Sequence, residues 1–134
     1  MRESRREVTQ LKLVALLIAA LGLVAGASGI KATLTAPTHT PRINIHWPYT
    51  VRVTKDGKAV AARLTAQIVD PTGSVHPVQF GKSTKNITKW PFKGVFRDYV
   101  VWPPSSRGIP LTFRLTIVVA QTRKVINYRV TAHA

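Results

Sequence analysis

Apolar and polar residues alternate with a period of two along most of the chain from Ile43 to Ala132. The clearest stretch is Leu111–Val119 (LTFRLTIVV), where large apolar side chains occupy one face and threonine and arginine occupy the other. Successive side chains of a β-strand point to opposite sides, so this pattern predicts strands with one buried face. By the same criterion we expect about seven strands, at 32–35, 49–53, 59–69, 74–80, 94–102, 111–119 and 125–132.

Turn signals separate these strands at short intervals. Asp56-Gly57 supplies the residues that a tight hairpin turn favours, and Asp70-Pro71-Thr72-Gly73 is typical of a type I turn. Residues 82–93 form a polar, basic stretch, and Gln121-Thr122-Arg123 turns the chain into the last strand. Because the pattern contains no amphipathic helix, the expected fold is all-β, an immunoglobulin-like β-sandwich.

A different pattern fills the first thirty residues. A basic flank over residues 1–12 precedes an uncharged apolar run from Leu13 to Ile30. At about 1.5 Å per residue, a helix of this run is about as long as a bilayer core is thick, which predicts a transmembrane anchor. Ala25-Gly26-Ala27 also fits a signal-peptidase site, with cleavage after Ala27. The run is therefore either an anchor or a removable signal peptide.

Both readings place the rest of the chain outside the cytoplasm, because the basic flank stays on the cytoplasmic side. We divide the chain into a basic cytoplasmic flank (1–12), a transmembrane anchor or signal peptide (13–30), an extended spacer (31–42) and the β-sandwich domain (43–134). The expected location is the cell membrane, as a single-pass protein with an extracytoplasmic C-terminal domain. Cleavage after Ala27 would make it a secreted protein.

Length and composition narrow the function classes. The 134 residues leave room for one core, which excludes large multidomain enzymes. The chain has no cysteine, so it has neither a disulfide framework nor a thiolate metal site. Its stability must come from packing, and we expect three tryptophans, each followed by a proline, to plug the ends of the core: Trp47, Trp90 and Trp102.

The chain is strongly basic. Lysine and arginine total 20 against 5 aspartates and glutamates, which gives a formal net charge of +15. A surface of this kind attracts polyanions. Several cations are concentrated in one segment and interleaved with aromatic residues, and we predict that they form an anionic-partner surface: Lys82, Lys85, Lys89, Lys93 and Arg97. Other envelope or membrane proteins, anionic lipids and wall polymers suit the expected location, whereas nucleic acid does not.

No constellation of residues predicts a reaction. The acids beyond the apolar run are Asp56, Asp70 and Asp98, and the first two belong to turns, so paired-carboxylate catalysis lacks a second partner. We expect Asp98 to pair with a cation of a neighbouring strand. The prediction is a protein that is not an enzyme, without catalytic residues, bound metal or cofactor. Its histidines have no local metal-binding spacing: His39, His46, His76 and His133.

Several short segments resemble a bacterial family. Trp47–Val53 (WPYTVRV) is followed by Asp56–Val60 (DGKAV), and later by Phe92–Phe96 (FKGVF) and Gly108–Thr112 (GIPLT). This layout is similar to that of membrane-anchored or secreted immunoglobulin-like envelope domains, distantly of the FixH/YtkA type. The resemblance implies an immunoglobulin-like fold and a role in the envelope. The sequence lacks the methionine-rich or His-Met cluster of the copper-associated relatives.

These observations support three hypotheses about function. The first is a non-enzymatic extracytoplasmic interaction or scaffold module, anchored to the membrane, whose basic face meets an anionic or protein partner. The second, implied by the resemblance, is an extracytoplasmic metal-handling accessory protein with ligands among the four histidines. The third is a small accessory subunit of a membrane complex, whose helix and apolar sandwich end would contact partner subunits.

Overall fold

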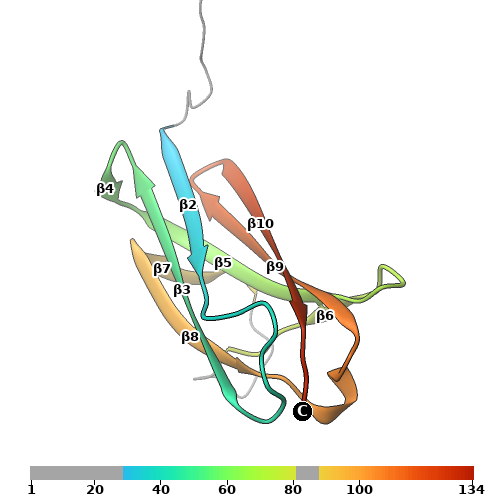
Figure 1. The fold of residues 1–134 in the computed structure, drawn as a ribbon. Helices are drawn as coiled ribbons and strands as arrows, with labels where there is room; N and C mark the ends of the chain where they lie inside the picture. The colour runs from blue at the N-terminus through green and yellow to red at the C-terminus, as the bar shows by residue number, and fades with distance from the viewer. Residues whose placement is uncertain (1–28, 81–87) are drawn as a thin grey trace, which may run out of the picture.

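The computed structural model describes residues 29–80 and 88–134, which form two sheets and one short 3-10 helix, Pro104–Ser106 (Figure 1). The described part contains nine strands. They are β2 (Ile30–Thr35), β3 (His46–Lys55), β4 (Lys58–Ala59), β5 (Ala61–Val69), β6 (Val75–Pro77), β7 (Trp90–Lys93), β8 (Val95–Val101), β9 (Pro110–Val119) and β10 (Thr122–Thr131).

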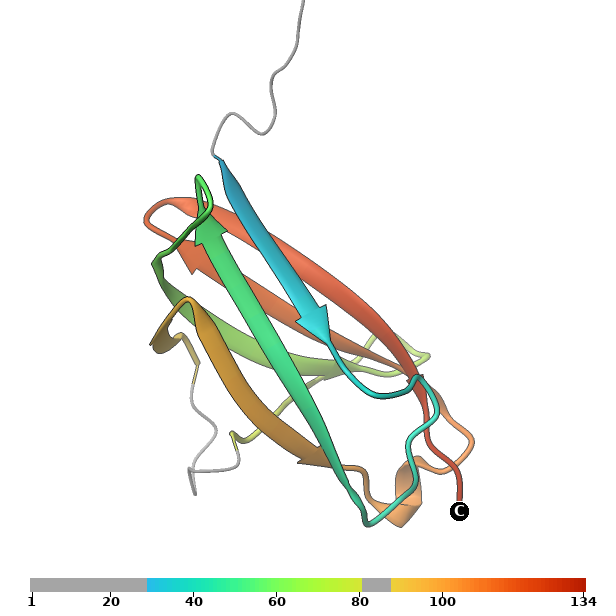
Figure 2. The ribbon, with the colours of Figure 1, turned by 60° about the vertical axis from the view of Figure 1, so that its left-hand side comes forward.

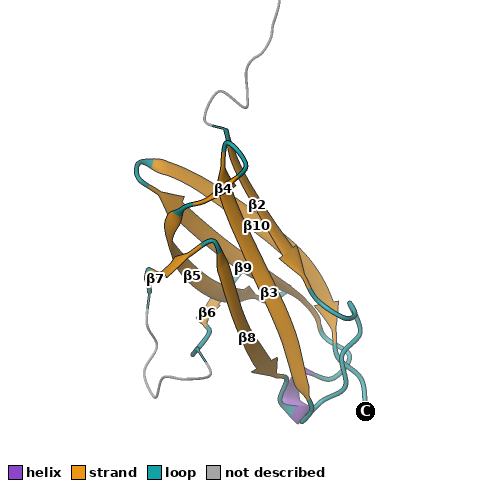
Figure 3. Ribbon diagram, turned by 90° about the vertical axis from the view of Figure 1, so that its left-hand side faces the viewer, coloured by secondary structure: helices purple, strands orange, loops and turns teal. Residues whose placement is uncertain are grey.

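The two sheets stack face to face (Figures 2 and 3). The five-stranded sheet has the order β10-β9-β5-β6, and β7 also pairs with β5. In the four-stranded sheet β2 pairs with one edge of β3, while β8 and β4 pair with successive parts of its other edge. All of these strand pairs are antiparallel. The prediction of an all-β, sandwich-like fold is confirmed.

Inward positions of the long strands supply the core. On β9 every second residue from Leu111 to Val119 is buried, and the residues between them are half-buried. Burying one large apolar side chain in this way contributes about 1.5–3 kcal/mol. The largest fully buried side chains come from both sheets and from the segments that join them, and they include Trp47, Trp102, Tyr49, Phe80 and Phe113.

Two tryptophans close one end of the sandwich. Trp47 on β3 and Trp102 just after β8 are 2% and 0% exposed, and their rings meet edge to face with centroids 5.5 Å apart. The Trp47 indole also donates a hydrogen bond to the carbonyl of Thr38, at 2.9 Å. The prediction that tryptophans plug the core is confirmed for this pair, and Trp90 on β7 is half-buried against the core.

The chain crosses between the sheets twice at one corner. Val60 joins β4 to β5, and Gly94 joins β7 to β8. The Gly94 amide donates to the Val60 carbonyl at 3.1 Å, so the two crossings are held together. Gly94 has φ 72°, and a Cβ there would lie 2.8 Å from the Cβ of Ala59, so this corner requires glycine.

The predicted spacer, residues 31–42, belongs to the folded unit instead. β2 pairs with β3 along its whole length. Residues 39–43 then run beside the end of β10, where the Thr131 amide donates to the carbonyl of His39 and the Ile43 amide donates to that of His133, both at 2.9 Å. Proline and threonine favour extended backbone, which suits a sheet edge as well as a linker. The sandwich therefore begins at Ile30 rather than at residue 43.

Two further predictions about elements are wrong in detail. The sequence pattern places Trp90–Lys93 inside a polar stretch, but these residues form β7, because the two aromatic side chains pack on the core. The last turn lies at Ala120 and Gln121, so Thr122 and Arg123 already belong to β10.

The two turns predicted earlier in the chain are confirmed. Asp56 and Gly57 link β3 to β4 and both have positive φ, at 52° and 81°. The Gly73 amide donates to the carbonyl of Asp70 at 2.9 Å, which closes the turn between β5 and β6.

The predicted basic flank (1–12) and the Ala27 cleavage site lie outside the described residues. So does the predicted anchor or signal segment (13–30), except for Gly29 and Ile30, and Ile30 is the first residue of β2. In the part of the chain that the structure describes, no helix is long and apolar enough to cross a membrane.

Candidate anionic-partner surface

Four arginines share the outer face of the five-stranded sheet. Arg63 on β5 and Arg123 on β10 lie opposite Val118 of β9 from its two sides, which places their Cα atoms about 10 Å apart. Arg114 lies in the middle of the sheet on β9, and Arg129 lies further along β10. We call this set the arginine face: Arg63, Arg114, Arg123 and Arg129. Among the described residues, no acid lies on it.

Hydrogen bonds hold two of these side chains against the sheet. Arg114 Nε donates to Asn127 Oδ1 at 3.0 Å, and a terminal nitrogen of Arg63 donates to the carbonyl of Lys89 at 3.4 Å. The Lys89 amide in turn donates to the hydroxyl of Thr65, at 3.0 Å. A guanidinium group has five N–H donors, so each arginine keeps donors for a ligand. The remaining surface between them is largely neutral and polar.

The cations predicted as one surface are not brought onto one face. Lys82 and Lys85 lie outside the described residues. Lys89 immediately precedes β7 and Lys93 ends it, so both border the arginine face. Arg97 lies on β8, on the outer face of the other sheet. The prediction that this segment forms a single face is wrong for its described part, because the chain changes sheets between Lys93 and Arg97.

The outer face of the four-stranded sheet is also basic. Lys31, Arg52 and Arg97 alternate there with threonines, and all three side chains are exposed. At the far end of this face the rings of His46 and Tyr99 stack with centroids 4.0 Å apart. These three cations lie two residues apart along paired strands, since Lys31 pairs with Thr54 and Arg97 pairs with Thr50 on either side of Arg52. The arginine face differs in having four cations and in the hydrogen bonds that hold Arg63 and Arg114 against the sheet.

The described acids lie away from both outer faces. Asp56 occupies the β3–β4 turn, Asp70 occupies the β5–β6 turn, and Asp98 is half-buried on the inner side of β8, opposite Tyr49. Burial first, and then the negative charge of Asp98, raises the pKa of Tyr49 above its ordinary value. The Tyr49 hydroxyl is therefore neutral. Because the three described acids lie elsewhere, the surface arginines share their faces only with uncharged or cationic residues.

Asp70 organises its turn. Its carboxylate accepts hydrogen bonds from His76 Nε2 at 2.9 Å, from the Thr72 hydroxyl, and from the amides of Thr72 and Ser74 at 2.9 and 3.0 Å. The bond from His76, followed by that from the Thr72 hydroxyl, lowers the pKa of Asp70 well below its ordinary value. The carboxylate therefore stabilises the turn, which is the role that the sequence predicted.

The four histidines lie in separate surroundings. His39 Nδ1 donates to the carbonyl of Arg129 at 2.6 Å, and its ring stacks on that of Tyr128 with centroids 3.9 Å apart. His46 contacts Tyr99 on the neighbouring strand of the same sheet, His76 contacts Asp70, and His133 lies beside Pro41. Within residues 29–80 and 88–134, no group of three or more His, Cys, Asp or Glu side chains is arranged to hold a metal ion.

The arginine face could be found only in part from the sequence. Alternation places Arg63, Arg114 and Arg129 at outward positions of their strands. It does not reveal that β5, β9 and β10 are neighbours, because alternation sets the face of a residue and leaves strand order open. The sequence therefore predicted a basic surface from one contiguous segment, whereas in the structure the arginine face comes from three separate strands.

No family model matches the sequence, and no curated protein matches it. Among solved structures, the chain is similar to a DUF4426 family protein from Pseudomonas aeruginosa, with a TM-score of 0.45, 15% sequence identity, and coverage of 75% of this chain and 87% of that chain. It is also similar to a DUF4466 family protein from Parabacteroides merdae, with a TM-score of 0.43, 12% identity, and coverage of 77% of this chain and 43% of that chain.

Proposed function

We propose that this protein is a non-enzymatic, membrane-anchored interaction module whose arginine face binds an anionic partner outside the cytoplasm. The observation that carries the proposal is the composition of that face, which among the described residues has four arginines, uncharged neighbours and no acid. Solubility alone is served equally well by a surface with both signs interspersed. A face of one sign attracts partners of the opposite sign and repels those of its own.

The proposed fold subclass is an immunoglobulin-like sandwich. Its support is the strand order, since β2, β3 and β8 form one sheet and β5, β9 and β10 form the other. Immunoglobulin-like domains divide their first, second and fifth strands from their third, sixth and seventh in the same way. Residues 39–43 extend the first strand to the edge of the last one. Such domains present broad sheet faces to partners.

The proposed location rests on the sequence before β2. The basic flank at 1–12 followed by the apolar run at 13–30 favours an anchored chain whose sandwich is translocated. In that location the partner of the arginine face is an anionic wall polymer or an acidic envelope protein. Cleavage after Ala27 would release the same sandwich with the arginine face unchanged.

The non-enzymatic part of the proposal rests on the acids. Asp56 and Asp70 are used by turns, and Asp98 lies on the inner side of β8 beside Tyr49. Paired-carboxylate catalysis needs two acids that face one substrate position. The described carboxylates do not provide such a pair, whereas the arginine face provides a binding surface.

A pair of charge-matched variants tests the proposal. The face variant carries Arg63→Gln, Arg114→Gln and Arg129→Gln, and the end variant carries Lys31→Gln, Lys55→Gln and Lys58→Gln, so each loses three cations. Binding of labelled dextran sulfate to the full chain in phosphatidylcholine nanodiscs is measured at several salt concentrations. Because exposed ion pairs each contribute about 0.2–1 kcal/mol, we expect the face variant to bind about tenfold more weakly.

The end variant serves as the control for net charge. We expect it to lose less than half as much binding free energy as the face variant. Its binding should depend on salt as steeply as that of the parent, whereas binding by the face variant should depend on salt less steeply. Equal losses in the two variants would mean that overall charge, and not the arginine face, attracts the polyanion. That result would refute the proposed function while leaving the fold unaffected.

A further inference from the structure

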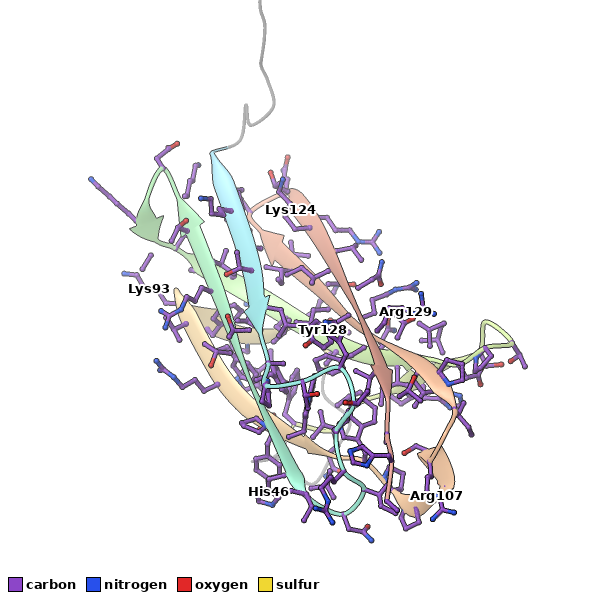
Figure 4. All side chains as sticks on the ribbon, in the orientation of Figure 1. His46, Lys93, Arg107, Lys124, Tyr128 and Arg129 are labelled. Atoms are coloured by element: carbon purple, nitrogen blue, oxygen red, sulfur yellow. The ribbon has the colours of Figure 1, made fainter. Side chains whose placement is uncertain are left out.

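A second group of cations surrounds one end of the sandwich. At this end β2 begins, β3 turns into β4, and β9 turns into β10 (Figures 1 and 4). Asp56 is the acid at this end in the described part of the chain. We call the five cations found there the amino-terminal cluster: Lys31, Lys55, Lys58, Arg123 and Lys124. Arg123 also belongs to the arginine face, so it is left unchanged in the variants of both groups.

Positions within this cluster point to an anion beyond the end of the fold. Lys55 and Lys58 are a directly opposed cross-strand pair, which is unfavourable for like charges without a counterion. Lys55 is the register partner of Ile30, and Lys124 is that of Ile117, so both occupy inner positions of their strands. Apolar side chains would close the core there, as Trp47 and Trp102 close the opposite end. The amino-terminal end is instead left charged.

The exit of the chain at this end is fixed. The Asp56 amide donates a hydrogen bond to the carbonyl of Gly29 at 2.9 Å. Gly29 has φ 63°, and a Cβ at this position would clash with the Asp56 carboxylate. Ile30, the last residue of the apolar run, is the first residue of β2. The chain therefore has no spacer between the run and the cluster.

We infer that the amino-terminal cluster binds anionic lipid headgroups of the membrane that holds the chain. The inference rests on the proposed membrane anchor, which places this end of the sandwich at the bilayer surface. There the cations lie within a Debye length of the headgroups, about 8–10 Å at physiological salt. Each basic residue near an anionic surface strengthens the association about fivefold. The contact would stand the sandwich on this end and leave the arginine face accessible along its side.

The test uses the absence of cysteine in the chain, which allows labelling at a single introduced site. One full-length variant carries Gln121→Cys, an exposed position in the β9–β10 turn, and another carries Ser105→Cys, an exposed position in the 3-10 helix near the opposite end. A fluorophore on each is quenched by a headgroup-labelled lipid in nanodiscs. The discs contain phosphatidylcholine alone or phosphatidylcholine with phosphatidylglycerol, at equal quencher content.

Lipid contact predicts that the label at 121 is quenched at least about twofold more in phosphatidylglycerol discs, and that high salt removes the difference. Adding Lys31→Gln, Lys55→Gln and Lys58→Gln should also remove it, whereas the three arginine-face substitutions should leave it unchanged. The label at 105 should respond to neither lipid. Equal quenching at 121 in both kinds of disc would overturn the inference.

Two further outcomes would also overturn it. If soluble glycerol phosphate abolished the difference at 121, the cluster would be a site for free phosphate rather than for a lipid surface. If the full chain did not enter discs, the proposed anchor would fail, and lipid binding by the cluster would fall with it. Incorporated protein whose quenching ignores lipid charge would overturn the lipid contact alone, leaving the anchor and the arginine face in place.

Discussion

At the scale of single residues, the surface charge of this molecule depends on where a few carboxylates lie. Asp70 is held by four hydrogen bonds within its turn, and Asp98 lies on the inner side of β8. Neither shares a face with Arg63, Arg114 or Arg129. Local sequence was sufficient to predict the turn role of Asp70, because a proline and a glycine follow it at the positions that a type I turn favours.

The lowered pKa of Asp70 predicts an acid-sensitive contribution to stability. A carboxyl group whose pKa is lower in the folded state stabilises the fold fully above its unfolded value, about 3.9, and loses that contribution as the pH falls through the folded value. We expect Asp70→Asn to lower the melting temperature at neutral pH and to flatten its decline below about pH 4. Thermal unfolding followed by circular dichroism across this range measures both effects.

A partial variant separates the causes of this effect. His76→Ala removes the strongest hydrogen-bond contribution to the lowered pKa of Asp70 but retains those of Thr72 and Ser74. It should therefore produce an intermediate melting temperature at neutral pH. If the melting temperature of Asp70→Asn fell with decreasing pH as steeply as that of the parent, Asp70 would not be the group that holds this turn.

At the scale of elements, the corner where the chain changes sheets determines which cations become neighbours. Lys93 ends β7 in one sheet, and Arg97 follows on β8 in the other. Sequence alternation correctly predicted the long strands, since each has one continuous apolar face. It missed β7, because Trp90 and Phe92 alternate with Pro91 and Lys93 over only four residues. It predicted the strand at 32–35 but could not show its partner, because alternation leaves strand order open.

Gly94 allows a sharp test of this corner. We expect Gly94→Ala to destabilise the fold by about 2–4 kcal/mol, because positive φ is unfavourable for alanine and its Cβ would lie 2.8 Å from that of Ala59. Gly73→Ala is the matched control: its φ is 89°, but no atom lies within 4 Å of an added Cβ, so it should lose only about 1–2 kcal/mol. Urea unfolding gives both values.

A rescue variant identifies the steric part of this loss. Ala59→Gly removes the atom that an added Cβ at Gly94 would meet. In the background of Gly94→Ala it should restore most of the difference from the Gly73→Ala control, although glycine itself costs about 0.5–1 kcal/mol in a strand. The same loss for Gly94→Ala with and without Ala59→Gly would show that the two crossings are not packed together.

At the scale of the whole molecule, the sandwich has two different ends and two basic sides. Trp47 and Trp102 seal one end, and lysines surround the end where β2 begins. The net charge of +15 was evident from composition, as was the all-β class from periodicity. The grouping of Arg63, Arg114 and Arg129 on one side was not, because it depends on antiparallel pairing between strands that are distant in sequence, such as Arg63 with Val118.

The arginine face is the central claim, and residue-resolved NMR tests it most directly. Full-length, isotope-labelled protein in phosphatidylcholine nanodiscs is titrated with dextran sulfate, and shifts of backbone amide and arginine side-chain signals are followed. We predict that the largest shifts map to Arg63, Arg114 and Arg129 and to the threonines between them, and that added salt reverses them. Largest shifts on the four-stranded sheet, or shifts spread evenly over all cations, would contradict the account.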